Sequence, residues 1–211
     1  MLVNDHGNCK KLNKEFWYPP PYRSIYKNNI ITFEKPIFVI HNKHNIEWNT
    51  SYINFINVDT LQYIFNKLKD KYQIIYIRQT NKIKHENYSY DNNEIKISDD
   101  LKDYELIDNE FSETVITFND LLKQYNYIYN ELLLMLYSNC DNYISTQGGA
   151  SITMSFFYKK MLILHIDGGS ELTSGVYDND GIFHDNNNEM NKELVICRNY
   201  DQLKEKIKMF I

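Results

Sequence analysis

Residues 140–151 read Cys140-Asp141-Asn142-Tyr143-Ile144-Ser145-Thr146-Gln147-Gly148-Gly149-Ala150-Ser151. Residues 143–145 have the aromatic and β-branched character of a short buried strand. The glycine pair permits a tight turn, and the apolar residues of 150–158 suit a helix. Such a junction can hold a phosphate on the backbone N–H groups that open the helix. A second interpretation stays open, in which the glycines only let the helix pack closely against the strand.

Strands and helices alternate on both sides of this junction. Continuous apolar runs predict buried strands at residues 37–40, 73–77, 114–117, 143–145, 161–164 and 194–196. Apolar residues at helical spacing predict helices at residues 61–68, 118–123, 127–138, 150–158 and 200–210. This alternation predicts an α/β fold, with a mainly parallel sheet of about five or six strands and helices on both faces. We expect the strand order to reverse beside strand 37–40, which would leave a crevice flanked by the loops at His41 and Gln147.

Residues 1–35 and residues 36–211 differ in pattern. Residues 1–35 lack helical or strand periodicity and include the aromatic and proline stretch Trp17-Tyr18-Pro19-Pro20-Pro21-Tyr22. They predict an irregular lead-in segment whose rings either pack on the domain or dock an SH3-like partner. Residues 36–211 then form a single α/β domain, in which the polar residues 80–113 predict a mobile insertion with a small strand near 94–97.

Composition limits the classes of partner. The 211 residues carry a net charge of −5 without a long basic run, which argues against nucleic-acid binding. Three cysteines lie far apart without a C-x-x-C pair, which favours a reducing, cytoplasmic location over disulfides or zinc. No apolar run is long enough to span a membrane. We predict no metal site, because His41 and His44 lack a third ligand at a fixed spacing and the Asp178-Asn179-Asp180-Gly181 stretch fits an ordinary turn.

Polar residues follow each predicted strand. Because parallel strands end at one edge of a sheet, these residues are expected to converge there. They are His41, Asn42, Lys43, His44, Asn45, Arg78, Gln79, Thr146, Gln147, Gly148, Gly149, Asp167, Gly168 and Gly169. A cation, amide donors and a glycine turn suit a ligand with a diphosphate and hydroxyl groups, although Arg78 equally fits a surface ion pair. The chain lacks G-x-G-x-x-G and P-loop motifs, which argues against a dinucleotide oxidoreductase and an NTPase.

Several of these segments resemble the nucleotide-sugar-binding half of GT-B glycosyltransferases, and are most similar to fucosyltransferase-like sequences. The resemblance covers about residues 35–200. Its segments are residues 35–43 (KPIFVIHNK), the Glu47-Trp48 pair, residues 75–78 (IYIR), residues 130–132 (NEL) and, most specifically, residues 140–149 (CDNYISTQGG).

This resemblance implies a Rossmann-like domain in which a GDP- or UDP-sugar lies across the strand ends. The implied donor-binding residues are Asn42, Arg78, Thr146, Gln147, Gly148, Gly149 and Ser151, with Arg78 near the diphosphate. His41 and Glu47 are the candidate catalytic residues, because a base can sit in the long loop after the first strand. Glycosyltransferases of this type usually work without a metal, so no cofactor is expected.

A complete GT-B enzyme has two Rossmann-like domains, and the base commonly belongs to the first. Here a short lead-in segment precedes the first strand, so the acceptor half is missing, belongs to a partner protein, or has been lost in a relic. We therefore predict slow hydrolysis of a nucleotide sugar at most, and no efficient transfer by the chain alone. Two other classes stay open: a non-catalytic module that binds sugar or nucleotide, and an interaction scaffold.

Overall fold

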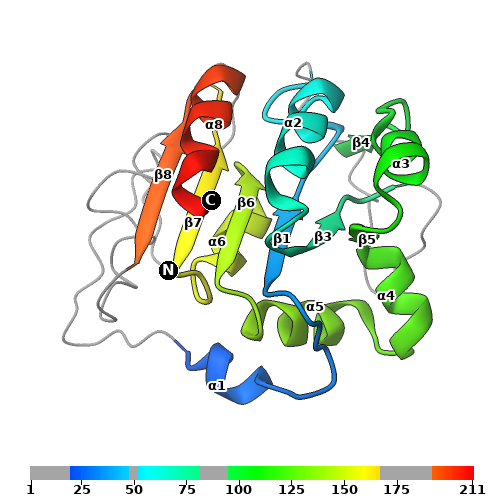
Figure 1. The fold of residues 1–211 in the computed structure, drawn as a ribbon, viewed down its shortest axis with the longest axis vertical. Coiled ribbons are helices and arrows are strands. Elements are labelled where there is room, and N and C mark those ends of the chain that lie inside the picture. The colour runs from blue at the N-terminus through cyan, green and yellow to red at the C-terminus, as the bar shows by residue number, and fades with distance from the viewer. Residues whose placement is uncertain (1–19, 48–51, 81–94, 167–191) are drawn as a thin grey trace.

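The computed structural model describes residues 20–47, 52–80, 95–166 and 192–211. These residues build one six-stranded sheet with helices on both faces (Figure 1). All neighbouring strands in this sheet pair in parallel. The strands are β1 (Ile37–His41), β3 (Gln73–Ile77), β5 (Val115–Thr117), β6 (Asn142–Thr146), β7 (Lys160–Leu164) and β8 (Glu193–Cys197). The predicted α/β fold is confirmed.

The order across the sheet is β5-β3-β1-β6-β7-β8. If only these six strands are counted along the chain, their order is 3-2-1-4-5-6, which is that of the doubly wound Rossmann fold. The order reverses between β1 and β6, as predicted. Such folds bind ligands beyond the carboxyl ends of the strands at this reversal, and the loops at His41 and Gln147 lie there.

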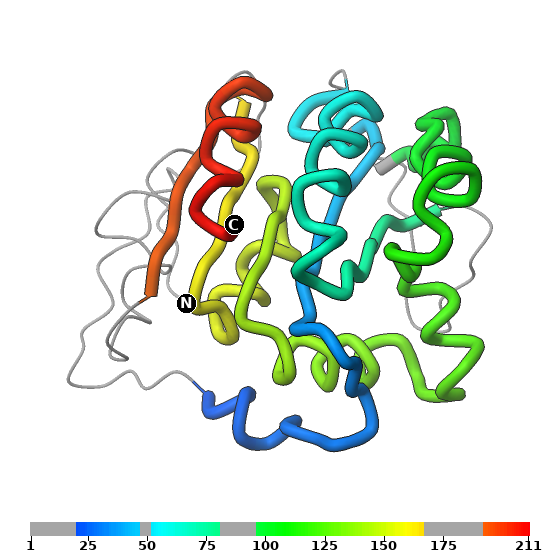
Figure 2. Tube along the Cα trace, viewed as in Figure 1, coloured from blue at the N-terminus to red at the C-terminus, as the bar shows by residue number. Residues whose placement is uncertain are grey.

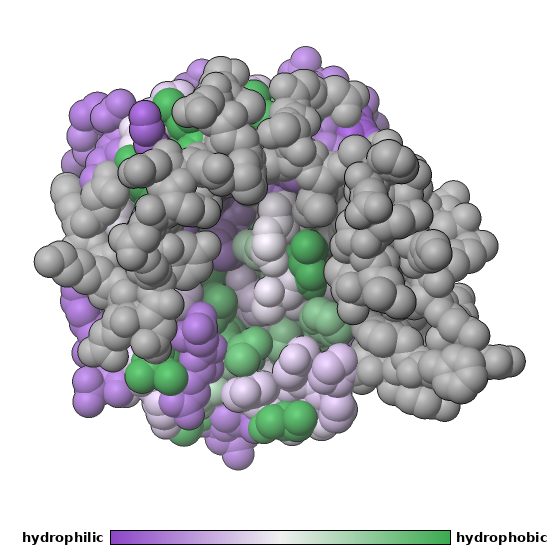
Figure 3. Space-filling model, turned by 180° about the vertical axis from the view of Figure 1, so that it is seen from behind, coloured by the Kyte–Doolittle hydropathy of each residue, from purple (hydrophilic) through white to green (hydrophobic). Residues whose placement is uncertain are grey.

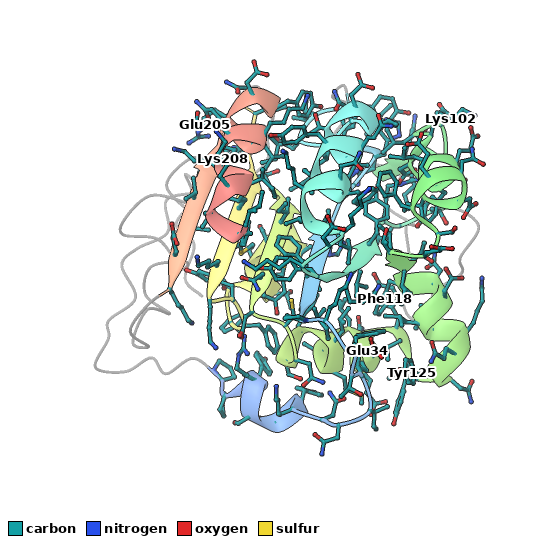
Figure 4. All side chains as sticks on the ribbon, in the orientation of Figure 1. Glu34, Lys102, Phe118, Tyr125, Glu205 and Lys208 are labelled. Carbon is teal, nitrogen blue, oxygen red and sulfur yellow. The ribbon has the colours of Figure 1, made fainter. Side chains whose placement is uncertain are left out.

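The two faces of the sheet have separate apolar cores. In β1, Phe38 packs with the face that carries α2 (Val58–Leu68), α3 (Asp103–Leu106) and α8 (Tyr200–Lys206), whereas Val39 packs with the opposite face. That opposite face carries α4 (Phe118–Tyr125), α5 (Tyr129–Ser138) and α6 (Gly149–Met154). Figure 4 shows Lys102 and Glu205 on the outer side of the helices, while Phe118 is 2% exposed and belongs to the core.

The lead-in segment is more ordered than expected. Residues Tyr22–Tyr26 form a short helix, α1, which lies beside α5 (Figure 2). Arg23 binds the Asp141 carboxylate at 2.7 Å and donates to the carbonyls of Cys140 and Phe157, and the Tyr22 ring stacks on that of Phe157. An irregular conformation is therefore wrong for residues 22–26, because ion pairing and ring packing attach them to the domain. Residues 1–19 lie outside the described part.

The small strand predicted near residues 94–97 is confirmed as β4 (Ile95–Ile97). It pairs antiparallel, beside the main sheet, with β2 (Asn45–Glu47), a short strand after β1 that the sequence did not predict. Helix α3 continues into a π-helix at Ile107–Phe111, and both contribute buried side chains to the core. The expected mobile insertion is therefore wrong for residues 98–111. Residues 81–94, Trp48, Asp167, Gly168, Gly169 and the 178–181 stretch lie outside the described residues.

The chain ends in α8 and a 3₁₀ turn at Ile207–Phe210, whose Phe210 ring packs on Phe38 with centroids 4.8 Å apart. Within the described ranges, no helix combines the length and apolar character needed to cross a membrane.

On the face opposite that of Figure 1, the described surface is hollowed between two grey regions, and weakly polar and apolar residues gather there (Figure 3).

Candidate functional site

A cavity of about 360 Å³ lies at the carboxyl ends of β1 and β6. Its walls come from the loop after β1, the turn after β6, and helices α5 and α6. The lining includes six of the predicted site residues, which are His41, Asn42, Thr146, Gln147, Gly148 and Gly149, and also Lys43. The volume is within the range of small-molecule pockets, about 300–1,000 Å³, and the position is where Rossmann-like folds bind ligands.

Gly148 shapes the turn between β6 and α6. Its backbone has φ 140° and ψ −171°, a conformation almost restricted to glycine. The Ser151 hydroxyl donates to the Gly148 carbonyl at 2.7 Å and so closes the turn. A Cβ atom built on Gly148 would lie 3.9 Å from Lys43 Nζ, which places the ammonium group beside this turn. Ser151 is thus a support of the turn rather than a lining residue.

Replacing Gly148 by Ala is expected to destabilise the fold by about 1–3 kcal/mol, because the positive φ disfavours any side chain. Steric contact is not the cause, since 3.9 Å is an ordinary distance. Urea denaturation measures the change. Gly149→Ala is the matched control: a Cβ there meets no atom of the described residues within 4 Å, and Ala favours a helix more than Gly does. Equal stability of the two variants would contradict this view of the turn.

His41 has a fixed partner behind the pocket. Its Nδ1 lies 3.0 Å from the Tyr137 hydroxyl. Burial raises the pKa of Tyr137 well above its usual value, so the phenol keeps its proton and can either donate to Nδ1 or accept from it. Burial also lowers the pKa of His41 to about 4, so the ring is neutral at pH 7. A pKa this low makes His41 a weak base, which argues against the predicted catalytic role.

Asn42 lines the pocket, but its amide bonds within the protein. Nδ2 donates to the Ile56 carbonyl at 2.9 Å and to the Tyr76 hydroxyl at 3.0 Å. Oδ1 accepts from the backbone N–H groups of Ile56 and Lys43 at 2.8 and 2.9 Å. Both donors and both acceptor positions are used. Asn42 therefore fixes the loop after β1, and its amide is not available to a sugar as the sequence had led us to expect.

Arg78 is not among the described residues that line the pocket. Its Nε and Nη2 atoms bind the two carboxylate oxygens of Asp103 at 2.5 and 2.8 Å, and Nη1 donates to the Ser98 carbonyl at 3.0 Å. Its side chain is 1% exposed and that of Asp103 0%. The ion-pair alternative is thus the one observed, although the pair is buried instead of exposed. A contact between Arg78 and a diphosphate has no support in this arrangement.

Other predicted residues have less defined roles. Thr146 lies in the pocket wall and is 3% exposed. Gly149 begins α6, a helix of only six residues. Glu47 ends β2, opposite Ile95, and its side chain is outside what the structure describes, so its catalytic role stays a prediction. In the described ranges, no three His, Cys, Asp or Glu side chains gather as a metal site would require.

The predicted donor-binding and catalytic residues omitted several lining residues. Lys43, His44, Asn45 and Gln79 were expected only as polar residues at the strand ends, and all four line the pocket. Tyr129 and Leu133 of α5, and Thr153 of α6, form the wall opposite the strand ends. No pattern in the sequence marks these helix residues as lining, because only the packing of α5 against the sheet brings them there.

No protein-family model matches the chain, and no curated protein matches it either. The fold and the pocket define a Rossmann-like α/β domain with a cavity at its strand-order reversal.

Proposed function

We propose that this chain is the nucleotide-sugar-binding domain of a GT-B type glycosyltransferase, and that a GDP- or UDP-sugar occupies the pocket between β1 and β6. The single observation that carries the proposal is the position and chemistry of that pocket. It lies at the reversal of a Rossmann-like sheet and brings a lysine, an imidazole and a primary amide together around a glycine turn.

The charge of the lining suits a diphosphate. The Lys43 ammonium lies beside Gly148, where the missing side chain lets a ligand approach the backbone. The described lining residues include no Asp or Glu, so no carboxylate among them would repel an anion. Tyr129 and Leu133 add an apolar wall, which suits a base or a sugar ring.

The same chemistry supports donor binding more than a complete transfer reaction. Inverting transfer needs a base within hydrogen-bond reach of the acceptor hydroxyl. His41 is a weak base, because burial lowers its pKa to about 4. A partner protein that carries an acceptor domain would supply this base. Alone, the chain is expected to hydrolyse nucleotide sugars slowly at most.

Lys43→Ala is expected to weaken binding of UDP or GDP by about ten- to hundredfold, because a charge-assisted contact contributes about 1.5–3 kcal/mol. Calorimetric titration in EDTA measures this and tests metal independence together. Lys35→Ala is the matched control, since Lys35 lies before the amino end of β1 and bonds the Lys69 carbonyl. Equal affinity of the Lys43 and Lys35 variants would show that Lys43 does not contact the bound nucleotide.

Turnover separates the remaining alternatives. The chain is incubated with nucleotide sugars and simple acceptors, and the products are followed by mass spectrometry. This assay distinguishes three outcomes. Transfer supports an enzyme, binding without turnover supports a non-catalytic module, and absence of nucleotide binding supports an interaction scaffold. Efficient transfer by the isolated chain would contradict the half-enzyme proposal.

A further inference from the structure

Two buried amide side chains meet behind the pocket. Asn54 belongs to the connection between β1 and α2 and is 1% exposed, and Gln147 follows β6 and is 0% exposed. Asn54 Oδ1 accepts from the backbone N–H of Ile166 at 2.6 Å. Because a backbone N–H can only donate, this contact fixes which end of the Asn54 amide is the oxygen. The other end, Nδ2, must donate, and it faces Gln147 Oε1 at 3.3 Å.

The orientation of Asn54 therefore sets that of Gln147. With its oxygen turned to Asn54, Gln147 presents its NH₂ group on the other side. That Nε2 is buried and has no hydrogen-bond partner in the part of the chain that the structure describes. Buried amide donors in native proteins are almost always paired, so an unpaired one in a pocket wall indicates an acceptor that arrives with a ligand or a water. Gln147 lines the cavity at the strand ends.

His41 also has a fixed partner, because the Tyr137 hydroxyl lies 3.0 Å from its Nδ1. The Lys43 ammonium lies near the Gly148 turn of the same pocket. An oriented amide donor with a cation, and no carboxylate among the described lining residues, form an environment that selects oxygen acceptors with negative charge.

We propose that Gln147 Nε2 donates to a phosphoryl oxygen, so that the pocket contains a pyrophosphate subsite, and that Asn54 is the positioning residue that orients this donor. This inference rests on the proposed function, from which it takes the class of ligand, and it identifies Gln147 as a hydrogen-bond donor to the diphosphate. It requires no sugar and no base. Inorganic pyrophosphate is therefore a sufficient probe.

The test is a double-mutant cycle in calorimetric titrations with pyrophosphate. Gln147→Met retains the volume of the side chain and removes the donor, and we expect about tenfold weaker binding. Asn54→Gly retains the left-handed backbone, φ 54°, and releases the Gln147 amide, with an expected loss of about three- to tenfold. In the Gln147→Met background, Asn54→Gly is expected to change nothing further, because the oriented group is already absent.

Asn126→Gly is the matched control, since Asn126 has a similar φ of 53° at the end of α4 and does not line the pocket. It is expected to bind pyrophosphate as the unmodified chain does, and thermal unfolding of each variant checks that it is folded. Additive losses in the double mutant would show that Asn54 acts through the fold alone, and would overturn its positioning role. Unchanged binding by Gln147→Met, or absence of pyrophosphate binding to the unmodified chain, would overturn the subsite.

The outcomes also separate this inference from the proposed function. If pyrophosphate binds with the expected dependence on Gln147 while GDP- and UDP-sugars do not bind, the subsite stands and the nucleotide-sugar proposal fails. If nucleotide sugars bind with no dependence on Gln147, the proposed function stands and the subsite is wrong.

Discussion

Replacing Asp103 by Ala is expected to destabilise the protein by about 3–5 kcal/mol, since it leaves the buried Arg78 charge without its partner. The Asp103 carboxylate binds Nε and Nη2 of Arg78 and also accepts from the Tyr76 hydroxyl at 2.6 Å. Neither side chain of the ion pair is more than 1% exposed. Urea denaturation at pH 7 measures the free energy of unfolding.

Two further variants separate the charge effect from other causes. Asp100→Ala removes an exposed carboxylate from the same segment and is expected to change stability by less than about 0.5 kcal/mol. The double substitution Arg78→Met with Asp103→Leu removes both charges and is expected to recover most of the loss, because apolar residues can replace a buried pair. A loss below about 1 kcal/mol for Asp103→Ala would contradict the structural role of this pair.

Acidification is expected to destabilise the protein through His41. The pKa of His41 is lowered by burial to about 4 in the folded chain, against 6.5 as the ordinary value. Below pH 6.5 the unfolded chain therefore binds a proton that the folded chain does not, and stability falls as the pH drops. The loss grows down to about pH 4, where folded His41 also protonates, and reaches about 3 kcal/mol at most.

Comparison with His41→Gln isolates this contribution, because glutamine does not titrate. Between pH 7 and pH 4.5, the free energy of unfolding of the unmodified chain should fall further than that of the variant. Burial also lowers the pKa of His44, which is present in both proteins and cancels in the difference. Parallel pH profiles for the two proteins would show that His41 is not a buried neutral imidazole.

The sequence predicted the parallel sheet because its strands are continuous apolar runs. Residues such as Ile40 and Ile75 pack in cores on opposite faces of one sheet, and this burial on both faces produces the runs. Helix α3 had no such signal. It is attached by its buried Leu106 and by the ion pair of Asp103 with Arg78, which lies 25 residues earlier, and no periodic pattern reveals a contact at that separation.

The site was predicted in position more than in the roles of its residues. Strand ends identify which residues reach the pocket edge, so the placement of Gln147 and Gly148 in its wall followed from the pattern of strands and turns. The uses of Asn42 and Arg78 depend on partners such as Ile56 and Asp103, which only the folded chain reveals. Both residues are polar groups at strand ends, and both bond within the protein.

A crystal structure of the chain with UDP or GDP tests the central proposal most directly. We expect the diphosphate to lie between Lys43 and the Gly148 turn, with a phosphoryl oxygen within hydrogen-bond distance of Gln147 Nε2. A nucleotide bound away from the β1 and β6 strand ends, or an empty pocket at saturating nucleotide, would contradict the proposed function.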